Sequence, residues 1–320
     1  MGNETAEMCA EKAAMQNSTN IYSVMATLDY NRAEPCIVRE TAHWAVVYKP
    51  PHLPTAPLRA DERDTLVYWF LHSPEVQKQS AEYGLRSREA QVRGKKAIEA
   101  GLLHRLDTDT RGLVLFAKDQ AVYDFLAARQ EAGQIIKTYC AFVEPNRVPE
   151  IDNGYGFGAT ELSMLKERST AQKGIAAQEQ VVVQEQIAAQ LPLTLESQFR
   201  NFGPGAKRVA PVFPGSRHYK KDGRLYTTVI EAADILPSPP LIRVRCRLSR
   251  GYRHQVRAHL AEAGFPIVGD PLYAPQGTEA PPESAQVGLQ LYAVSLEFPD
   301  PENPRQSIRV ALPPPDKMNP

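Results

Sequence analysis

The stretch LIRVRCRLSRGYRHQVRAHLAEAG (241–264) changes its periodicity half-way along. Apolar side chains occupy every second position from Ile242 to Leu248, and the positions between them are arginines. Alternation of this kind predicts a strand with one buried face. From His254 the spacing becomes helical, and Gly264 is a typical helix end. The stretch therefore predicts a strand followed closely by a helix.

Further strands and helices are predicted on both sides of this unit. Short runs rich in β-branched and aromatic residues predict strands, and spaced apolar residues behind a polar first residue predict helices. The predicted strands are 43–49, 112–118, 135–144, 291–298 and 307–312, and the predicted helices are 65–72 and 119–133. Strands and helices do not alternate strictly. The expected fold class is therefore α+β, with a central mixed, mostly antiparallel sheet flanked by helices.

The chain divides into one long domain and flanking segments of different composition. Residues 1–39 are polar and weakly periodic, which is typical of a flexible tail or a short added element. Residues 40–313 are expected to form the main domain, and 314–320 a C-terminal tail. Within it, 145–220 is rich in Gly, Pro and Gln and is interpreted as an insertion or long connection, with a helix-like patch at 176–190.

Composition indicates an ordinary globular protein. The 320 residues contain 37 Lys or Arg and 37 Asp or Glu, so the formal net charge is zero. Between Glu196 and Arg257, however, there are 13 basic residues and only 4 acidic ones, a balance that is typical either of a basic face or of a set of solvated loops. Four scattered cysteines and the lack of a signal or membrane-spanning sequence favour a cytoplasmic protein with reduced thiols and no membrane partner.

The stretch HRLDTDTRGL (104–113) holds Asp107 just before the predicted strand 112–118. Alone, such an aspartate is most often a turn residue. A comparison with the H-R-D loop of protein kinases fails, because Leu106 interrupts the motif and neither the following Asn nor a preceding glycine-rich loop is present.

Together with four further motifs, this stretch resembles the RluA-type pseudouridine synthases. The other matches, in order, are VVYKPPHLPT (46–55), KTYCAFVE (137–144), SRGYRHQVRAHLAEAGFPIVGDPLY (249–273) and LQLYAVSLEFPDP (289–301). The resemblance implies the pseudouridine synthase fold over 40–313. It also implies an isomerase that converts uridine to pseudouridine in structured RNA.

The resemblance also implies the chemistry. The bond from ribose to uracil nitrogen is broken, the base turns, and ribose is rejoined to carbon, with neither a metal nor a cofactor required. The target uridine must be flipped out of the RNA to be reached. Asp107 is then the nucleophile or the base acting on ribose, Arg257 pairs with it, and Tyr139 stacks on the flipped base and accepts the later proton.

The remaining site residues implied by the resemblance contact the substrate. Arg105 fills the gap left by the flipped base, and Leu291 packs on the target ring. The other substrate-binding positions are His104, His254, Gln255 and Lys49, of which Lys49 fits a structural role or one near the site better than a catalytic role. A metal site among His104, His254 and His259 is disfavoured, because the last two are five residues apart and no acidic partner accompanies them.

Two positions depart from the family pattern. The family shows G-R-[TS]-H-Q where this chain has Gly-Tyr252-Arg253-His-Gln, and Thr-Ser-Gly where this chain has Thr-Arg111-Gly. The first 40 residues are too short and too polar for the N-terminal RNA-binding domain of many relatives. Ribosomal RNA and transfer RNA are both family substrates, and a monomer is expected.

Two other functions compete with this one. An inactive RNA-binding relative would bind RNA without isomerising it, with Asp107 dispensable. An enzyme for free nucleosides would not need the basic 196–257 region, and salt-dependent RNA binding would argue against it.

Overall fold

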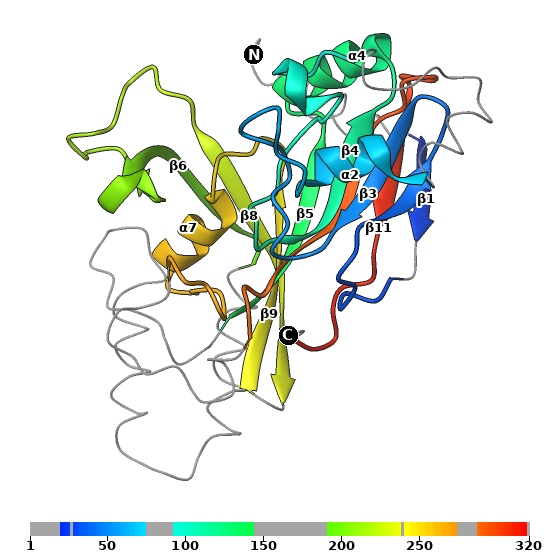
Figure 1. Ribbon diagram of the computed structural model, residues 1–320. Helices are drawn as coiled ribbons and strands as arrows, with labels where there is room; N and C mark the ends of the chain where they lie inside the picture. Colours follow the sequence, from blue (N-terminus) through cyan, green and yellow to red (C-terminus); the bar gives the residue numbers. More distant parts are fainter. Residues whose placement is uncertain are drawn as a thin grey trace, which may run out of the picture.

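The computed structural model describes residues 20–25, 28–74, 92–143, 191–237, 240–273 and 287–318. Figure 1 shows a large twisted sheet with helices packed against it. The strands are β1 (Asn20–Met25), β2 (Cys36–Glu40), β3 (Trp44–Lys49), β4 (Arg111–Ala117), β5 (Ile136–Val143), β6 (Leu193–Phe202), β7 (Arg208–Val212), β8 (Tyr226–Pro237), β9 (Pro240–Leu248), β10 (Leu291–Pro299) and β11 (Gln306–Ala311). The helices are α2 (Leu66–His72), α4 (Gln120–Glu131) and α7 (Gln255–Glu262), with short 3-10 turns η2 (Ala97–Glu99) and η3 (Pro204–Ala206).

The sheet is mixed and mostly antiparallel, as predicted. Its main order is β2-β3-β4-β10-β5-β9-β8-β6-β7, and β11 joins β10 to β1. Within the described segments the parallel pairs are β4 with β10 and β1 with β11. The last part of the chain thus inserts β10 between β4 and β5, which follow each other in the sequence. The α+β class is confirmed.

Local sequence explains where the helices begin. The Thr65 hydroxyl accepts a hydrogen bond from the backbone N–H of Tyr68 at 3.1 Å, which caps α2. The Asp119 carboxylate caps α4 in the same way, through the N–H of Val122 at 2.9 Å. Among the described helices, none has the length and apolar character needed to cross a membrane.

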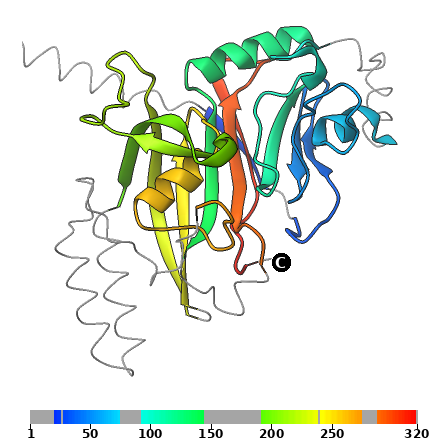
Figure 2. The same ribbon diagram turned by 60° about the vertical axis from the view of Figure 1, so that its left-hand side comes forward.

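The core has two layers, one on each face of the sheet. Every residue of β3 and β4 is buried, because both faces of these strands are covered. On one face, α2 and α7 pack in a single apolar cluster, with Phe70 and Leu260 among its members. On the other face, Leu126 of α4 packs in the second cluster. Figure 2 shows α7 standing in front of the strands and α4 running across one end of the sheet.

Several strands lie where the sequence predicted none. β1 and most of β2 fall in the range 1–39, where β1 pairs with β11 and β2 pairs with β3. β6 and β7 fall in the range 145–220, and there the sheet continues instead of giving way to a connection. The helix-like patch at 176–190 lies outside the described residues. The domain boundaries themselves stay a prediction.

Candidate active site

A cleft of about 1760 Å³ opens on the side of the sheet that carries α2 and α7. It is much larger than the roughly 300–1,000 Å³ of a small-molecule pocket. Its lining includes eleven Lys or Arg and seven Asp or Glu. Several of the basic residues belong to the 196–257 region, and others, such as Arg59 and Lys95, come from earlier in the chain. The cleft therefore suits a long, negatively charged ligand.

The cleft is lined by eight of the nine residues that the sequence placed in the site, all except Lys49, and four of these eight are Asp107, Tyr139, Arg257 and Leu291. These four come from the loop before β4, from β5, from α7 and from the start of β10. Arg257 Nη1 lies 3.1 Å from Asp107 Oδ2, so the two groups form an ion pair. The guanidinium is almost fully buried and the carboxylate is partly exposed to the cleft. The negative charge of Asp107 is thus both compensated and accessible.

A second carboxylate, Asp270, fixes the position of Arg257. Its oxygens accept hydrogen bonds from Arg257 Nε at 2.8 Å and from Nη2 at 2.7 Å. Asp270 Oδ1 also accepts from the backbone N–H groups of Leu272 and Tyr273. The side chain of Asp270 is completely buried. Since a bidentate contact fixes the guanidinium plane, Nη1 can only point towards Asp107.

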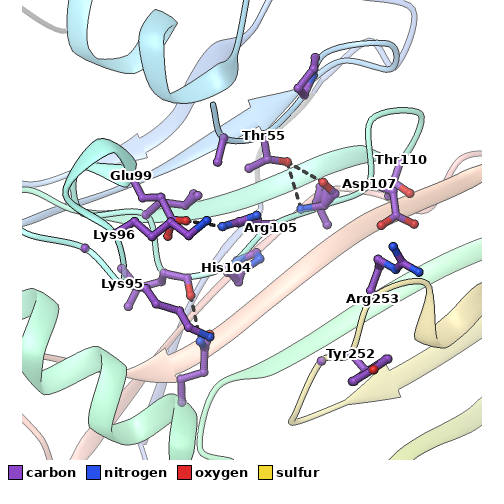
Figure 3. A pocket seen from close by; sticks show the side chains of 18 of the residues that line it. Thr55, Lys95, Lys96, Glu99, His104, Arg105, Asp107, Thr110, Tyr252 and Arg253 are labelled. Carbon is purple, nitrogen blue, oxygen red and sulfur yellow. Dashed lines mark hydrogen bonds and ion pairs between the residues drawn. The ribbon is translucent and has the colours of Figure 1, made fainter. Parts of the chain in front are cut away.

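The backbone around Asp107 is fixed by the first motif. The Thr55 hydroxyl donates to the carbonyl of Leu106 at 2.7 Å and accepts from its N–H at 3.1 Å (Figure 3). Lys49 Nζ donates to the carbonyls of Thr108, Pro50 and Leu53, each at 2.8 Å. These bonds hold the chain on both sides of Asp107.

Lys49 has this supporting role and does not line the cleft in the described part of the chain. Its ammonium group is fully buried, and burial lowers the pKa of Lys49 to about 7, against the opposing effect of Asp107 and Asp109. Three carbonyl acceptors need three hydrogens, which only the protonated amine provides. The geometry therefore assigns Lys49 to the support of the loop.

Gly112 allows the strand after Asp107 to reach the centre of the sheet. Its φ is +132°, and a Cβ at this position would lie 2.2 Å from the carbonyl oxygen of Ala293 in β10. No side chain fits this approach. The glycine after the Asp107 loop is thus required by the parallel pairing of β4 with β10.

Tyr139 lies on β5 beside Asp107 and is buried. Burial, and after it the charge of Asp107, raise the pKa of Tyr139 well above its usual value of about 10. The phenol is therefore protonated at neutral pH. Leu291, also buried, gives the same part of the cleft an apolar surface. Both side chains can contact a flat ring held near Asp107.

His254 and Gln255 join the cleft to α7. His254 has a left-handed backbone (φ 55°), and its Nε2 lies 3.8 Å from Asp107 Oδ1. Burial lowers the pKa of His254, although Asp107 opposes this effect. Gln255 donates to the carbonyl of Thr227 and the hydroxyl of Thr228, so its amide ties α7 to β8.

His104 and Lys137 supply further buried nitrogen atoms to the cleft. His104 Nε2 accepts from the N–H of Leu115 at 3.3 Å, which places the proton on Nδ1. That Nδ1 has no hydrogen-bond partner among the described residues. Lys137, two residues before Tyr139, is nearly fully buried, and burial lowers its pKa to about 8. Both residues line the cleft.

Arg105 is exposed at the rim of the cleft and pairs with the buried carboxylate of Glu99 (Figure 3). Arg111 lies elsewhere. It is buried on the opposite face of the sheet, where Nη1 donates to the carbonyl of Tyr30 at 3.3 Å and the guanidinium lies 5.3 Å from the ring of Tyr292. The Arg111 departure from the family pattern therefore belongs to the core and not to the site.

Sequence reasoning missed four residues of this site: Thr55, Glu99, Lys137 and Asp270. Three of them stand inside the quoted motifs 46–55, 137–144 and 249–273, where their position was a usable signal. Glu99 lies in a charged stretch without any periodicity, and nothing in the sequence ties it to Arg105.

Comparisons with known proteins identify the family of the chain. The family described as RNA pseudouridylate synthase matches residues 43–262, more than half of the chain. The chain is 24% identical over 284 residues to ribosomal large subunit pseudouridine synthase D of Pseudomonas aeruginosa, covering 86% of this chain and 66% of that protein. It is 24% identical over 280 residues to RNA pseudouridine synthase 2, chloroplastic, of Oryza sativa, covering 76% and 51%. It thus spans about half to two thirds of these relatives.

The fold is similar to a solved structure, human RNA pseudouridylate synthase domain containing 4. The TM-score is 0.51 at 16% sequence identity, and the match covers 88% of each chain. This likeness concerns the architecture of the sheet and its helices.

Proposed function

Because the chain belongs to the RNA pseudouridylate synthase family, we propose that it isomerises uridine to pseudouridine in a structured RNA. The observation that carries the proposal is the Asp107–Arg257 ion pair beside Tyr139, inside a basic cleft large enough for RNA. The names of its relatives, including the Pseudomonas aeruginosa protein, point to large-subunit ribosomal RNA as the first substrate to test. Transfer RNA is the second.

The residues of the cleft fit the steps of the isomerisation. The bond from ribose C1′ to uracil N1 breaks while Asp107 attacks the ribose as nucleophile or removes a proton from it as base. The freed uracil turns, and C1′ is joined to C5. In the nucleophilic route this step breaks the bond between Asp107 and C1′, and in the basic route Asp107 returns its proton to the ribose. C5 loses its proton and N1 gains one, so atoms and electrons balance without any oxidant or reductant.

The surroundings support a proposed part for each neighbouring side chain. Arg257 keeps a positive charge beside Asp107, and the rings of Tyr139 and uracil can stack while the base turns. The protonated phenol of Tyr139 favours stacking over proton abstraction, because a buried tyrosine is a poor base. Arg105, at the rim, can occupy the place of the flipped base in the RNA.

The test uses purified protein with transcribed large-subunit ribosomal RNA and with bulk transfer RNA, and pseudouridine is mapped by chemical labelling and primer extension. Asp107→Asn should lower the rate by a factor on the order of a thousand or more, with the fold unchanged. The matched control is Asp109→Asn, a carboxylate of the same loop that pairs with exposed His52. It should keep the activity.

The competing function is an RNA-binding protein without catalysis. It would show salt-dependent RNA binding and no pseudouridine in any of these RNAs, with Asp107→Asn equal to the unmodified chain. That result would remove the isomerase proposal. We expect the protein to be located in the cytoplasm and to be a monomer.

A further inference from the structure

Tyr252 stands where the family pattern has an arginine, and its ring forms part of the cleft wall. It is half-buried. Phe199 of β6 stacks on it with ring centroids 5.0 Å apart and planes within 9°. Tyr226 of β8 lies 5.0 Å from Tyr252 at 60°, and also lines the cleft. Phe199 is not among the described residues of the lining, so it supports the wall from behind.

The neighbouring arginine holds this aromatic group in place. Arg253 Nη2 donates to the carbonyls of Ala206 at 2.6 Å and Arg208 at 3.2 Å, and to Asn201 Oδ1 at 3.3 Å. It thereby attaches the β6–β7 hairpin, on whose first strand Phe199 lies, to the segment of Tyr252. Arg253 lies one position after the arginine of the family pattern, and it supports Tyr252, which stands at the position of that arginine.

The backbone of Tyr252 is fixed as well. Its N–H donates to Gln255 Oε1 at 2.9 Å, and the amide of Gln255 is bound to β8. A ring that packs against two other rings and lines a cleft is a preformed contact surface. If Tyr252 served the core alone, burial of the whole ring would have been more favourable.

The surroundings select the kind of ligand. The same wall carries Arg224, Arg250 and Arg253, and Figure 3 shows Tyr252 and Arg253 across the cleft from Lys95 and Lys96. Aromatic rings interleaved with cations are the usual means of binding unpaired nucleotides, with the bases on the rings and the phosphates near the cations. Arg224 pairs with Glu131, whereas Arg250 and Arg253 donate to neutral acceptors among the described residues, so their positive charge is available to a phosphate.

Tyr252 is also close to the reacting centre. His254, two residues along the same turn, has its Nε2 3.8 Å from Asp107 Oδ1. Two residues span at most roughly 7 Å of backbone. The ring of Tyr252 is thus within reach of a nucleotide that directly adjoins the one bound at Asp107.

We propose that Tyr252, supported by Phe199 and Tyr226, is a stacking platform for an unpaired base next to the target uridine. It selects RNA in which that neighbour is free to stack. This inference rests on the proposed function and names a residue that determines its substrate preference.

The first test compares substitutions of Tyr252 on an RNA that the protein isomerises. Tyr252→Leu removes the ring and keeps an apolar side chain, and we expect KM to rise about 5- to 100-fold with kcat within about two-fold. Tyr252→Phe, the matched control, should stay within about two-fold in both constants. Tyr252→Arg, which restores the family residue, should resemble Tyr252→Leu for this RNA. An unchanged KM in Tyr252→Leu overturns the proposal.

The second test separates stacking from a merely structural role. Each nucleotide beside the target uridine is replaced in turn by an abasic site. At one position the abasic site should raise KM of the unmodified protein by the same factor as the Tyr252→Leu substitution does. The same abasic site should not raise KM of the Tyr252→Leu variant any further. If the two effects multiply at every position, the ring does not contact the RNA.

A binding measurement distinguishes failure of the stacking proposal for Tyr252 from failure of the proposed isomerase function. A uridine decamer with one 2-aminopurine is titrated with the unmodified protein, Tyr252→Phe and Tyr252→Leu. Quenching by the first two and not by the third supports the platform even if no RNA is isomerised. Isomerisation with equal quenching by all three proteins removes the platform and leaves the proposed function intact.

Discussion

The carboxylate of Asp270 binds the guanidinium of Arg257 through two hydrogen bonds of 2.8 and 2.7 Å, in the interior of the protein. The remaining Nη1 of the same group reaches Asp107 at 3.1 Å. Asp270 does not itself line the cleft in the described part of the chain, yet it determines where the charge opposite Asp107 lies.

Asp270→Asn should therefore affect both catalysis and stability. Removing one partner of a buried ion pair costs about 3–5 kcal/mol of unfolding free energy. We also expect kcat to fall about 10- to 100-fold with KM little changed, because Arg257 loses its fixed orientation. Urea unfolding and steady-state kinetics measure the two effects. The control is Asp234→Asn, whose pair with Arg243 is partly exposed and should contribute about 1 kcal/mol or less.

If Asp270→Asn lowered stability and left kcat as it was, Asp270 would be a residue of the fold alone. Kinetics are therefore measured at a temperature where the variant is folded, as judged by circular dichroism.

Thr55→Val tests the support of the Asp107 loop. The substitution keeps the shape of the side chain and removes both hydrogen bonds to Leu106, leaving buried backbone groups without a partner. The expected cost is about 1–3 kcal/mol of unfolding free energy, with a lower kcat. Thr227→Val is the matched control, since the Thr227 hydroxyl bonds only the exposed Glu196 among the described residues. Equal kinetics for the two variants would show that the loop does not depend on Thr55.

Arg111→Met tests whether the face of the sheet opposite the cleft contributes to stability and not to activity. Arg111 is buried against Tyr30 and Tyr292, away from the cleft, so the variant should lose about 1–3 kcal/mol of unfolding free energy. Its kcat/KM should stay within about two-fold. Asp107→Asn should give the reverse result, with stability kept and activity lost. A large rise in KM for Arg111→Met would mean that this arginine does affect RNA binding.

Acid should destabilise the protein through His259. This histidine is buried between the hydroxyls of Ser197 and Thr228, each at 2.9 Å, and burial lowers its pKa to about 3. The unfolded chain has a His pKa of about 6.5. Between these values the unfolded state binds a proton that the folded state does not, so stability falls as the pH drops from about 6.5 towards 3.

The slope reaches about 1.4 kcal/mol per pH unit for one such group. It is measured from urea unfolding at several pH values between 7 and 4. His259→Gln should reduce the slope, whereas His52→Gln, at the exposed surface, should not. A parallel pH dependence for all three proteins would contradict the assignment to His259.

The sequence predicted the elements whose partners are close along the chain or whose pattern is strong. β9 and α7 follow from the alternation and helical spacing in 241–264, and the caps Thr65 and Asp119 mark α2 and α4. β1 pairs with β11, nearly 300 residues away, and no local pattern carries that information. β6 and β7 were hidden by the turn-forming residues around η3.

Site residues could be predicted where they lie inside the family motifs. They could not be predicted where their position depends on contact with a segment that is distant in the sequence. Asp107, Tyr139, Arg257 and Leu291 meet in one cleft, as the resemblance implied. The pairing of Arg105 with Glu99 and the stack of Tyr252 on Phe199 depend on how distant segments fold together. The catalytic roles of Asp107, Tyr139 and Arg257 stay predictions until the variants are measured.

The place of β10 between β4 and β5 has a consequence for the synthesis of the protein. When the ribosome has made residues 1–290, the edges of β4 and β5 have no strand between them, and Leu291 is missing from the cleft. The Asp107 loop, Tyr139 and Arg257 have been synthesised by then. The pairing of β10 with β4 and β5, which sets the spacing between these side chains, has not yet formed. The sheet that positions these side chains is therefore complete only after β10 has been synthesised and has paired with β4 and β5.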